Sequence, residues 1–377
     1  MKMDAALRPE DFRWMGRALE LAGRGAGMTS PNPVVGAVLV AAGRAVGEGF
    51  HARAGAAHAE AEALGQAGAA ARGTTLYVTL EPCNHTGRTA PCVDAITTAG
   101  VKRVVVAISD PNPRVSGGGV AALSRAGVEV TVGCRESEAI ALNRVFIIAA
   151  RRGRPHATLK WAATLDGATA DARRASRWIT GPEARLEAHR MRSRADAVVV
   201  GIGTALADNP GLDVRLGHPW PREPFRVVVD SRARLPVSAR LIGAGKPARA
   251  LVAITDAADP ERLRNLETRG VMVLRCKSHE GHVDVSDLVS RLGALDVGGI
   301  LVEGGGTLAW AFLEAGLVDR VVAFTAPKLL GGASAPRALE GTGLLLPEAI
   351  RLEGICVRPI GRDWMMEADV VHEGVKV

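Results

Sequence analysis

The chain has few aromatic residues and no long apolar run. Phe, Trp and Tyr together make up 3% of its 377 residues, so stacking surfaces for single-stranded nucleic acid are scarce. The 47 basic residues are spread along the chain, and we expect no nucleic-acid partner despite the net charge of +7. The longest apolar runs, such as 104–108 and 197–200, have the length of strands and not of membrane spans. We therefore expect no membrane partner either.

Cysteine is also rare, with five residues at scattered positions. A disulfide framework normally needs an even, closely spaced set, so these cysteines indicate a reducing compartment. Residues 1–20 carry charges throughout and lack the apolar centre of a signal peptide. We therefore expect a cytoplasmic protein.

The length exceeds what one hydrophobic core usually holds and predicts two domains. The first half alternates predicted helices, at 11–24, 58–71, 92–99 and 137–150, with predicted strands, at 34–40, 75–80, 103–109 and 128–132. This alternation predicts an α/β layer with a largely parallel sheet. The basic, turn-forming stretch 151–155 predicts the boundary, with domains at 1–150 and 155–377.

The second half begins a new strand-rich unit. Strands are predicted at 156–162, 195–200, 225–230, 248–254, 299–302 and 320–325, and helices at 183–194 and 307–315. The last predicted element, 363–370, has the pattern of a terminal edge strand. No G-x-G-x-x-G follows the first strand of this half, so a Rossmann domain is not indicated.

One histidine, one glutamate and two cysteines carry the most specific signal. His58-Ala59-Glu60 is followed by Pro82-Cys83 and Pro91-Cys92. One imidazole and two thiolates leave a fourth position open on zinc, as in catalytic sites, whereas structural sites are closed by four protein ligands. Glu60 completes the H-x-E…P-C pattern of zinc-dependent deaminases, in which glutamate moves protons and is not a ligand. The pattern predicts hydrolytic removal of an amino group from a nitrogen heterocycle.

Several alternatives to this interpretation stay open. His51 and His85 are rival zinc ligands, and His85 could instead contact substrate. His58 and Glu60 could also be surface residues of an alanine-rich helix. The long segment 84–91 between the cysteines differs from the usual C-x-x-C of nucleoside and nucleic-acid deaminases. A nucleoside or nucleic-acid deaminase with a helper domain, and a non-catalytic scaffold, are the rival functions.

The motifs resemble those of the bifunctional deaminase–reductase family of riboflavin biosynthesis. In the first half the similar segments are 31–36 (PNPVVG), 58–60 (HAE), 79–89 (TLEPCNHTGRT) and 110–113 (DPNP). In the second half they are 165–167 (LDG), 176–180 (SRWIT), 203–210 (GTALADNP) and 302–307 (VEGGGT). That family joins a diaminohydroxyphosphoribosylaminopyrimidine deaminase to a 5-amino-6-(5-phosphoribosylamino)uracil reductase.

The resemblance implies a cytidine-deaminase-like three-layer α/β/α domain followed by a dihydrofolate-reductase-like α/β domain. It implies Zn²⁺ and NADPH as cofactors and a small phosphoribosylated pyrimidine as substrate, and we expect a homo-oligomer. By this similarity Glu60 is the catalytic residue, and the metal ligands are His58, Cys83 and Cys92. The implied cofactor contacts are Ala162, Trp178, Thr204, Asp208, Ser231, Gly305, Gly306 and Thr307. The implied substrate contacts are Asn32, Ser176, Arg192, Leu212, Arg215 and Glu303.

Local chemistry is compatible with these assignments. Three glycines, 304–306, lie between a predicted strand and a predicted helix, where backbone N–H groups can hold a phosphate. Guanidinium groups such as those of Arg192 and Arg215 match phosphate oxygens bidentately. The alternatives are a simple tight turn for the glycines and a solvated surface position for each arginine.

Overall fold

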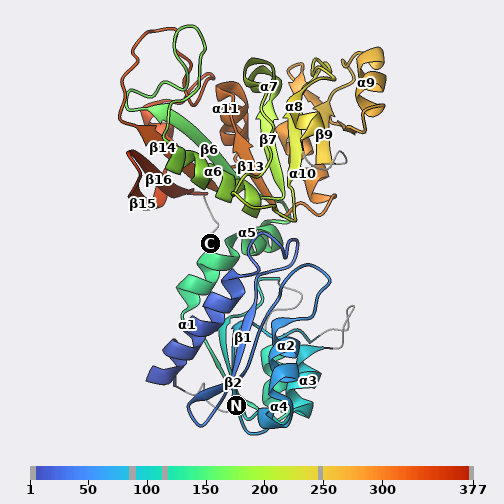
Figure 1. Cartoon of the computed structure of the whole chain (residues 1–377), viewed down its shortest axis with the longest axis vertical. Helices are drawn as coiled ribbons and strands as arrows, with labels where there is room; N and C mark the ends of the chain where they lie inside the picture. Colours follow the sequence, from blue (N-terminus) through green and yellow to red (C-terminus); the bar gives the residue numbers. More distant parts are fainter. Residues whose placement is uncertain (1–5, 85–90, 113–117, 245–248, 373–377) are drawn as a thin grey trace. The chain divides into compact units, whose positions relative to one another are not determined.

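The computed structural model describes residues 6–84, 91–112, 118–244 and 249–372, and the chain divides into two compact units. The first unit is Met1–Gly153 and the second is Arg154–Val377. Each unit is built around its own sheet, of five strands in the first and nine in the second (Figure 1). Among the described residues, no helix has the length and apolar character needed to cross a membrane.

The first unit contains five strands and five α-helices within its described residues. The strands are β1 (Gly36–Ala41), β2 (Arg44–Phe50), β3 (Thr75–Leu80), β4 (Arg103–Ile108) and β5 (Glu129–Val132). The helices are α1 (Pro9–Gly23), α2 (Ala59–Ala67), α3 (Cys92–Thr98), α4 (Gly118–Arg125) and α5 (Glu136–Arg152), with a short 3₁₀ turn η1 (Gly68–Ala71) after α2.

Side chains of alternating direction build two cores, one on each face of this sheet. On β1, Ala37 and Leu39 face the core with α2, α3 and α4, whereas Val38 and Val40 face the core with α1 and α5. The same alternation runs along β4, where every residue is buried. The helices on the two faces make the unit a three-layer α/β/α sandwich (Figure 1).

The prediction of a largely parallel sheet is wrong for this unit. The strand order is β2-β1-β3-β4-β5, and the pairs β1–β2 and β1–β3 are antiparallel, whereas β3–β4 and β4–β5 are parallel. The cause is β2, which the sequence analysis did not predict. A hairpin turn with positive φ at Ala42 and Gly43 connects it to β1.

Two glycines explain why β2 is hard to recognise in the sequence. A Cβ atom at Gly47 would lie 2.1 Å from the carbonyl oxygen of Ala63, and one at Gly49 would lie 2.3 Å from that of Ala59. Helix α2 therefore packs directly on the backbone of β2. Close packing of this kind needs glycine, although glycine weakens the strand signal, and it seats the helix that carries His58 and Glu60.

A buried ion pair anchors α1 to the sheet. Asp11 accepts two hydrogen bonds from the Arg103 guanidinium, at 2.7 and 2.9 Å, and one from the Tyr77 hydroxyl at 2.9 Å. Its other role is local, because it accepts the Arg8 N–H at 2.8 Å at the start of α1. These bonds lower the pKa of Asp11 against the opposing effect of burial. Replacing one partner would leave a buried charge unpaired.

The second unit contains more helices and strands than the first within its described residues. Its strands are β6 (His156–Thr164), β7 (Ala197–Gly201), β8 (Phe225–Val229), β9 (Ala250–Ile254), β10 (Met272–Arg275), β11 (Ser278–His279), β12 (His282–Val283), β13 (Gly299–Glu303), β14 (Arg320–Ala326), β15 (Leu352–Ile360) and β16 (Asp363–Val370). Its helices are α6 (Pro182–Arg194), α7 (Ile202–Asp208), α8 (Arg240–Gly243), α9 (Pro260–Glu267), α10 (Val285–Gly293), α11 (Gly306–Glu314) and the 3₁₀ turn η3 (Leu346–Glu348).

The main sheet has the order β10-β9-β8-β7-β13-β6-β14-β16-β15 and is parallel from β10 to β14. Helices α10 and α11 cover one face, and α7, α8 and α9 contribute to the core on the other. The segment 363–370 is a strand as predicted, but its edge position is wrong. Strand β15 pairs outside it in antiparallel register, and β15 itself was not predicted.

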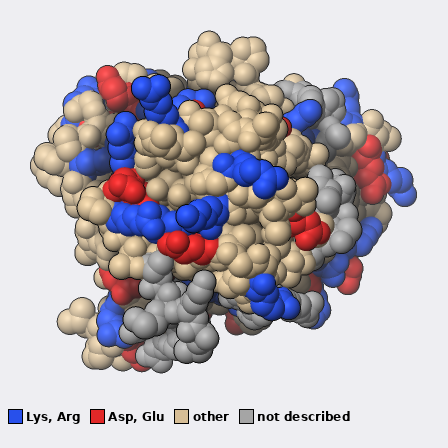
Figure 2. Space-filling view, turned by 90° about the horizontal axis from the view of Figure 1, so that it is seen from below, with Lys and Arg blue, Asp and Glu red and all other residues tan. Residues whose placement is uncertain are grey.

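Charged side chains on the visible face of the molecule are mixed by sign. On the face in Figure 2, the blue and red side chains of the described residues lie among uncharged surface. A mixed surface of this kind produces no extended field of one sign there.

Candidate functional site

The three predicted metal ligands of the first unit lie together. The Nδ1 atom of His58 is 3.1 Å from the Cys92 sulfur and 3.6 Å from the Cys83 sulfur, and all three ligand atoms lie within 4.8 Å of one another. A tetrahedral zinc, at about 2.3 Å from sulfur and about 2.0 Å from nitrogen, spaces its ligands by roughly 3.3–3.8 Å. The soft donor set and its spacing therefore fit zinc. No other group of three or more such side chains occurs among the described residues.

Local backbone structure explains this convergence. His58 is the N-cap of α2, Cys92 is the first residue of α3, and Cys83 follows the end of β3. The backbone N–H of Cys92 donates to the Cys83 sulfur at 3.4 Å. The start of a helix favours thiolate over thiol, because the helix dipole is positive there.

Glu60 lies in the first turn of α2 and is 4% exposed, so it is not a surface residue of an alanine helix. Burial raises the pKa of its carboxyl above the ordinary value. The hydrogen bond with Cys92 lowers the pKa of the Cys83 thiol to about 4, and the same bond together with burial raises the pKa of Cys92. The Glu60 carboxyl and the sulfurs of Cys83 and Cys92 thus lie close together, and their negatively charged forms repel one another. A bound dication would offset that repulsion.

The rival ligand His51 does not join the cluster. Its Nδ1 lies 3.0 Å from the Ala57 carbonyl oxygen and its Nε2 lies 3.2 Å from the Asn32 side-chain nitrogen. The predicted substrate contact Asn32 is therefore brought next to the site through His51, whose ring centroid is 5.8 Å from that of His58. The other rival, His85, lies outside the described residues.

Glu81 is a positioning residue that the sequence analysis missed. Its buried carboxylate accepts backbone N–H groups from Asp110 at 3.0 Å, Gly119 at 2.9 Å and Val120 at 3.0 Å. Glu81, two residues before Cys83, thus joins the end of β3 to the end of β4 and to the start of α4. An acidic residue at the end of an apolar strand was the available signal.

Several of the predicted site residues of the second unit lie at one edge of its sheet. They lie at or just after the carboxyl ends of the adjacent parallel strands β8, β7 and β13. Ser231 follows β8, Thr204 and Asp208 lie on the helix after β7, and Gly305 follows β13. Ligands of open parallel sheets bind at this edge.

Glu303, at the end of β13, is the centre of a buried charge cluster. Its carboxylate accepts hydrogen bonds from Arg192 Nε and Nη2, both at 2.8 Å. Burial alone would raise the pKa of Glu303, but the positive charges of Arg192 and Lys160 hold it at about 2. Because Arg192 also donates to the Asp213 carbonyl, much of its guanidinium is engaged within the protein. The exposed Arg215 is better placed to meet a phosphate from solution.

Two further members of this cluster were missed in the sequence. Strand register places Lys160 beside Glu303, with its Nζ 4.0 Å from the carboxylate, and burial lowers the pKa of Lys160. His189 accepts the backbone N–H of Arg215 at 3.2 Å. Burial and the charges of Arg192 and Arg215 lower the pKa of His189 to about 4. For Lys160, the only signal in the sequence was a lysine inside the apolar run of β6.

The glycine turn before α11 has the geometry of a phosphate cradle. Gly304 and Gly305 have φ values of 113° and 90°, a region that favours glycine. A Cβ at Gly305 would lie 3.3 Å from the Thr204 hydroxyl, so the turn packs against a predicted cofactor residue. Packing explains the glycine at position 306, since a Cβ there would lie 2.6 Å from the side chain of Glu340. The first N–H groups of α11, from Gly306 and Thr307, follow this turn, and N–H groups at a helix start can hold an anion.

The remaining predicted residues differ in how they could reach a ligand. Ser176 donates to the Asp208 carboxylate at 2.8 Å, which joins a predicted substrate residue to a predicted cofactor residue. Trp178 is 61% exposed, with the Arg185 guanidinium 4.5 Å from its ring. Leu212 is buried in the core, so only its main chain could contact a substrate.

Two predicted cofactor contacts lie on the flanks of this edge. The Ser231 hydroxyl accepts the Val283 N–H at 3.0 Å, which ties the loop after β8 to the β11–β12 hairpin. Ala162 lies on β6, half-buried against the core beside α6.

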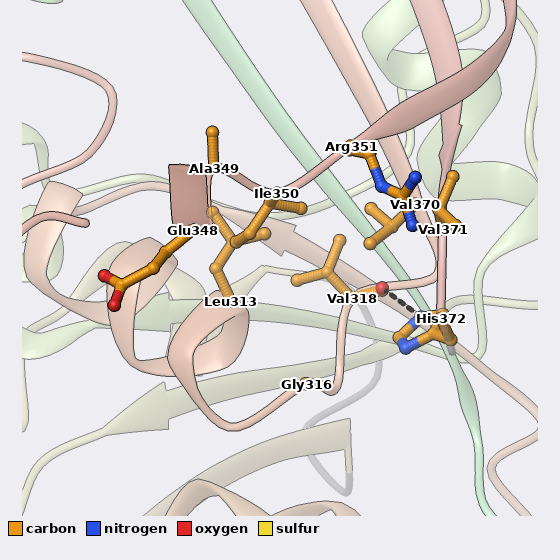
Figure 3. Close-up of a pocket in the computed structure, with 10 residues that line it drawn as sticks. All are labelled: Leu313, Gly316, Val318, Glu348, Ala349, Ile350, Arg351, Val370, Val371 and His372. Carbon is orange, nitrogen blue, oxygen red and sulfur yellow. Dashed lines mark hydrogen bonds between the residues drawn. The ribbon is translucent and has the colours of Figure 1, made fainter. Parts of the chain in front are cut away.

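A separate cavity of about 220 Å³ lies at the other end of α11. Leu313, Val318, Ile350 and Val370 give it apolar walls, and the His372 ring donates to the Val318 carbonyl oxygen at 2.9 Å (Figure 3). Glu348 also lines the cavity, with its carboxylate turned away from the apolar side chains (Figure 3). None of the predicted site residues lines this cavity, so it is not part of either candidate site.

Comparison with known protein families matches both units. The protein-family model for the RibD C-terminal domain matches residues 155–366. The model for the cytidine and deoxycytidylate deaminase zinc-binding region matches residues 9–108. The two matches coincide with the two candidate sites.

Similar proteins extend over nearly the whole chain. The riboflavin biosynthesis protein RibD of Aquifex aeolicus is 45% identical over 325 residues, which cover 86% of this chain and 89% of the relative. The structure of Acinetobacter baumannii RibD has a TM-score of 0.86 at 39% identity, covering 96% of this chain and 99% of that one. A Thermotoga maritima protein described as a diaminohydroxyphosphoribosylaminopyrimidine deaminase/5-amino-6-(5-phosphoribosylamino)uracil reductase has a TM-score of 0.83 at 36% identity, with the same coverage.

Proposed function

This chain belongs to the RibD family of riboflavin biosynthesis proteins, and we propose which of its residues carry out each of the two reactions of a bifunctional deaminase and reductase. The substrate is 2,5-diamino-6-(5-phosphoribosylamino)pyrimidin-4(3H)-one, which is deaminated first. Its product is then reduced at the ribosyl carbon. The observation that carries the first assignment is the His58–Cys83–Cys92 cluster with a buried Glu60 beside it.

In the deamination, His58, Cys83 and Cys92 would hold zinc, which when bound makes hydroxide available near neutral pH. Glu60 accepts one proton of the attacking water and delivers it to the ring nitrogen. It then accepts the second proton, from the hydroxyl group of the adduct, and delivers it to the amine, which leaves as ammonia while the carbonyl forms. Its burial supports this role, because a carboxyl with a raised pKa exchanges protons more readily near neutrality. Asn32, whose side-chain nitrogen lies 3.2 Å from Nε2 of His51, orients the pyrimidine.

In the reduction, the turn at Gly305 and the start of α11 would hold a phosphate of NADPH, which when bound supplies a hydride. The proposed cofactor contacts around it are Ala162, Trp178, Thr204, Asp208 and Ser231. The substrate contacts are Ser176, Leu212 through its main chain, Arg215 and the Arg192–Glu303 pair. Lys160 gives the proton that the reduction consumes, because its buried ammonium has a lowered pKa and lies next to Glu303.

Mass analysis of the products tests this sequence of reactions. Without NADPH the enzyme should convert the phosphoribosylated diaminopyrimidinone to the deaminated, unreduced compound. With NADPH it should form the deaminated ribityl compound. Reduction without prior deamination, or release of no ammonia, would contradict the proposed order.

Glu60→Gln separates the chemistry from the metal. We expect deamination to fall by about 10²–10⁴-fold, the usual contribution of a general acid–base group. Zinc content should stay at the wild-type level, and so should reduction of substrate deaminated beforehand. Wild-type turnover by this variant would remove Glu60 from the mechanism.

We also propose that the domains at 1–150 and 155–377 each carry one activity. Along the chain, the first compact unit ends at Gly153, which follows α5 and has a left-handed conformation. Cutting the chain near Gly153 should yield a zinc-loaded deaminase piece and a separate reductase piece. Insolubility of both pieces made alone would instead indicate that each domain needs the other.

The edge strand β15 supports a homo-oligomer. Ile355 and Val357 on this strand are 61% and 56% exposed, and such apolar edges favour pairing with another chain. Ile355→Lys should lower the molar mass measured by light scattering, and an unchanged mass would exclude β15 as the interface.

All five cysteines lie in the described part of the chain and are free thiols, which supports the proposed cytoplasmic location.

A further inference from the structure

His51 makes two hydrogen bonds that together determine its tautomer. Its ring is buried, with Nδ1 3.0 Å from the Ala57 carbonyl oxygen and Nε2 3.2 Å from the Asn32 side-chain nitrogen. A carbonyl oxygen can only accept, so Nδ1 must carry the proton. In the neutral ring Nε2 is then an acceptor, and it receives an N–H from Asn32.

This arrangement decides which way the Asn32 amide faces. Because its NH₂ group turns toward His51, its Oδ1 turns away from that ring. Asparagine could otherwise present either end of its amide to a ligand. His51 thus presets Asn32 as a hydrogen-bond acceptor.

The backbone around Asn32 is held just as firmly. The Asn32 N–H donates to the Thr29 carbonyl at 2.9 Å, and the His51 N–H donates to the Val35 carbonyl at 2.9 Å. The Asn143 amide, at the kink of α5, bonds both the N–H and the carbonyl of Val34, each at 2.9 Å. The backbone near Asn32 is thus tied to the fold, and the bond to His51 sets which end of the amide faces that ring.

We propose that His51 is a positioning residue for deamination, which orients Asn32 to accept a hydrogen bond from an N–H group on the edge of the aminopyrimidinone. The proposal rests on the proposed function of the first unit. An aminopyrimidinone carries such donors in its ring N–H and exocyclic amines. A site built to bond an N–H group discriminates strongly against an analogue that lacks it. His51 itself is not a member of the His58–Cys83–Cys92 cluster.

Two conservative variants distinguish this role from a role in the zinc site. In His51→Gln the side-chain oxygen can occupy the place of Nε2 and still accept from Asn32. In His51→Asn the amide can replace the Nδ1 donor to Ala57, but the acceptor for Asn32 is lost. We expect His51→Gln to keep most of the deamination kcat/KM. His51→Asn and His51→Ala should lose about 10–100-fold, mainly through a higher KM.

Zinc content and NADPH-dependent reduction, measured on the same preparations, should match wild type in all three variants. If His51→Asn is active and His51→Gln is not, His51 acts through Ala57 and the adjacent His58, and the proposal is wrong. Loss of zinc from His51→Ala would lead to the same conclusion. His218→Ala, an exposed histidine of the second unit, is the matched control and should leave deamination unchanged.

A double-mutant cycle tests the link to Asn32 directly. If His51 works through Asn32, adding His51→Ala to Asn32→Ala should cost no further activity. Losses that multiply would overturn the proposal. Wild-type enzyme in the same assay separates the proposed deaminase function from the proposed role of His51. If wild type does not deaminate the substrate, the proposed function is refuted, and the tautomer of His51 is not.

Discussion

The two units assemble their candidate sites in different ways. In the first, His58, Glu60, Cys83 and Cys92 come from one short stretch of chain, at two helix starts and one strand end. In the second, the residues come from adjacent strands, from α6 and from loops that lie far apart in the sequence. A site of the first kind can be recognised from spacing. A site of the second kind depends on the order and register of the sheet.

The sites also differ in how their charges are balanced without a ligand. In the first unit the two sulfurs and Glu60 crowd together, and only His58 is positive beside them. In the second unit Arg192 and Lys160 already compensate Glu303. Burial raises the pKa of Glu60, and the hydrogen bond with Cys83 raises that of Cys92, so both groups favour their neutral forms until a cation offsets the negative charge. The second cluster is balanced by its own side chains. Four experiments test this contrast.

Removing a thiolate should have the largest effect. We expect Cys83→Ser and Cys92→Ser to lose zinc and reduce deamination to background, because serine does not replace a soft thiolate on zinc at neutral pH. Reduction should persist, since it belongs to the other unit. Metal analysis and both assays on one preparation check this. A variant that keeps full zinc would show that its cysteine is a core residue and that the ligand set is different.

Disturbing the Glu303 cluster should affect only the second unit. Lys160→Met keeps the length of the side chain but removes its charge, and we expect reduction to fall by about 10²-fold or more. Deamination and zinc content should stay unchanged. Arg291→Met, at an exposed ion pair with Asp287, is the matched control. Wild-type reduction by Lys160→Met would assign the proton to another group.

Cofactor choice should depend on the second unit alone. A 2′-phosphate that meets one arginine gains about 1.5–3 kcal/mol, so NADPH should bind roughly ten- to a hundred-fold more tightly than NADH. Arg215→Ala and Arg192→Ala should raise the substrate KM and leave NADPH affinity nearly intact. Fluorescence titration of both cofactors measures this. Equal affinities would contradict the cofactor assignment, and a loss confined to NADPH binding in Arg192→Ala would reassign that arginine.

The smallest effect concerns stability below neutral pH. The pKa of His189 is lowered to about 4 in the folded protein, whereas an unfolded histidine titrates near pH 6.5. A depressed pKa stabilises the fold fully above about pH 6.5, and this contribution is lost as the pH falls toward 4. His189→Asn, which can still accept the Arg215 N–H, should flatten the pH dependence of the thermal unfolding of the second unit. Parallel curves for variant and wild type would contradict this.

Much of the fold could be predicted from local patterns. Strand β3 and the starts of α3 and β6 lie at the predicted residues, because alternating or continuous apolar runs and turn residues mark them. The elements that were not predicted include β10 and the helices α4, α7, α9 and α10. Two further failures were β2, hidden by glycines that admit α2, and β15, whose exposed side chains do not alternate as in a half-buried strand. Both failures changed the topology, since each missed strand pairs in antiparallel fashion.

The sequence by itself predicted that His58, Cys83 and Cys92 lie together with Glu60 close by, because those residues are close along the chain and helix starts bring them together. Only the tertiary structure decided that His51 bonds Asn32 instead of the metal, and that Lys160 lies beside Glu303. These pairings depend on strand register and loop packing between distant segments. Such contacts leave no spacing pattern in the chain, because the hydrophobic core that produces them is satisfied by many different sequences.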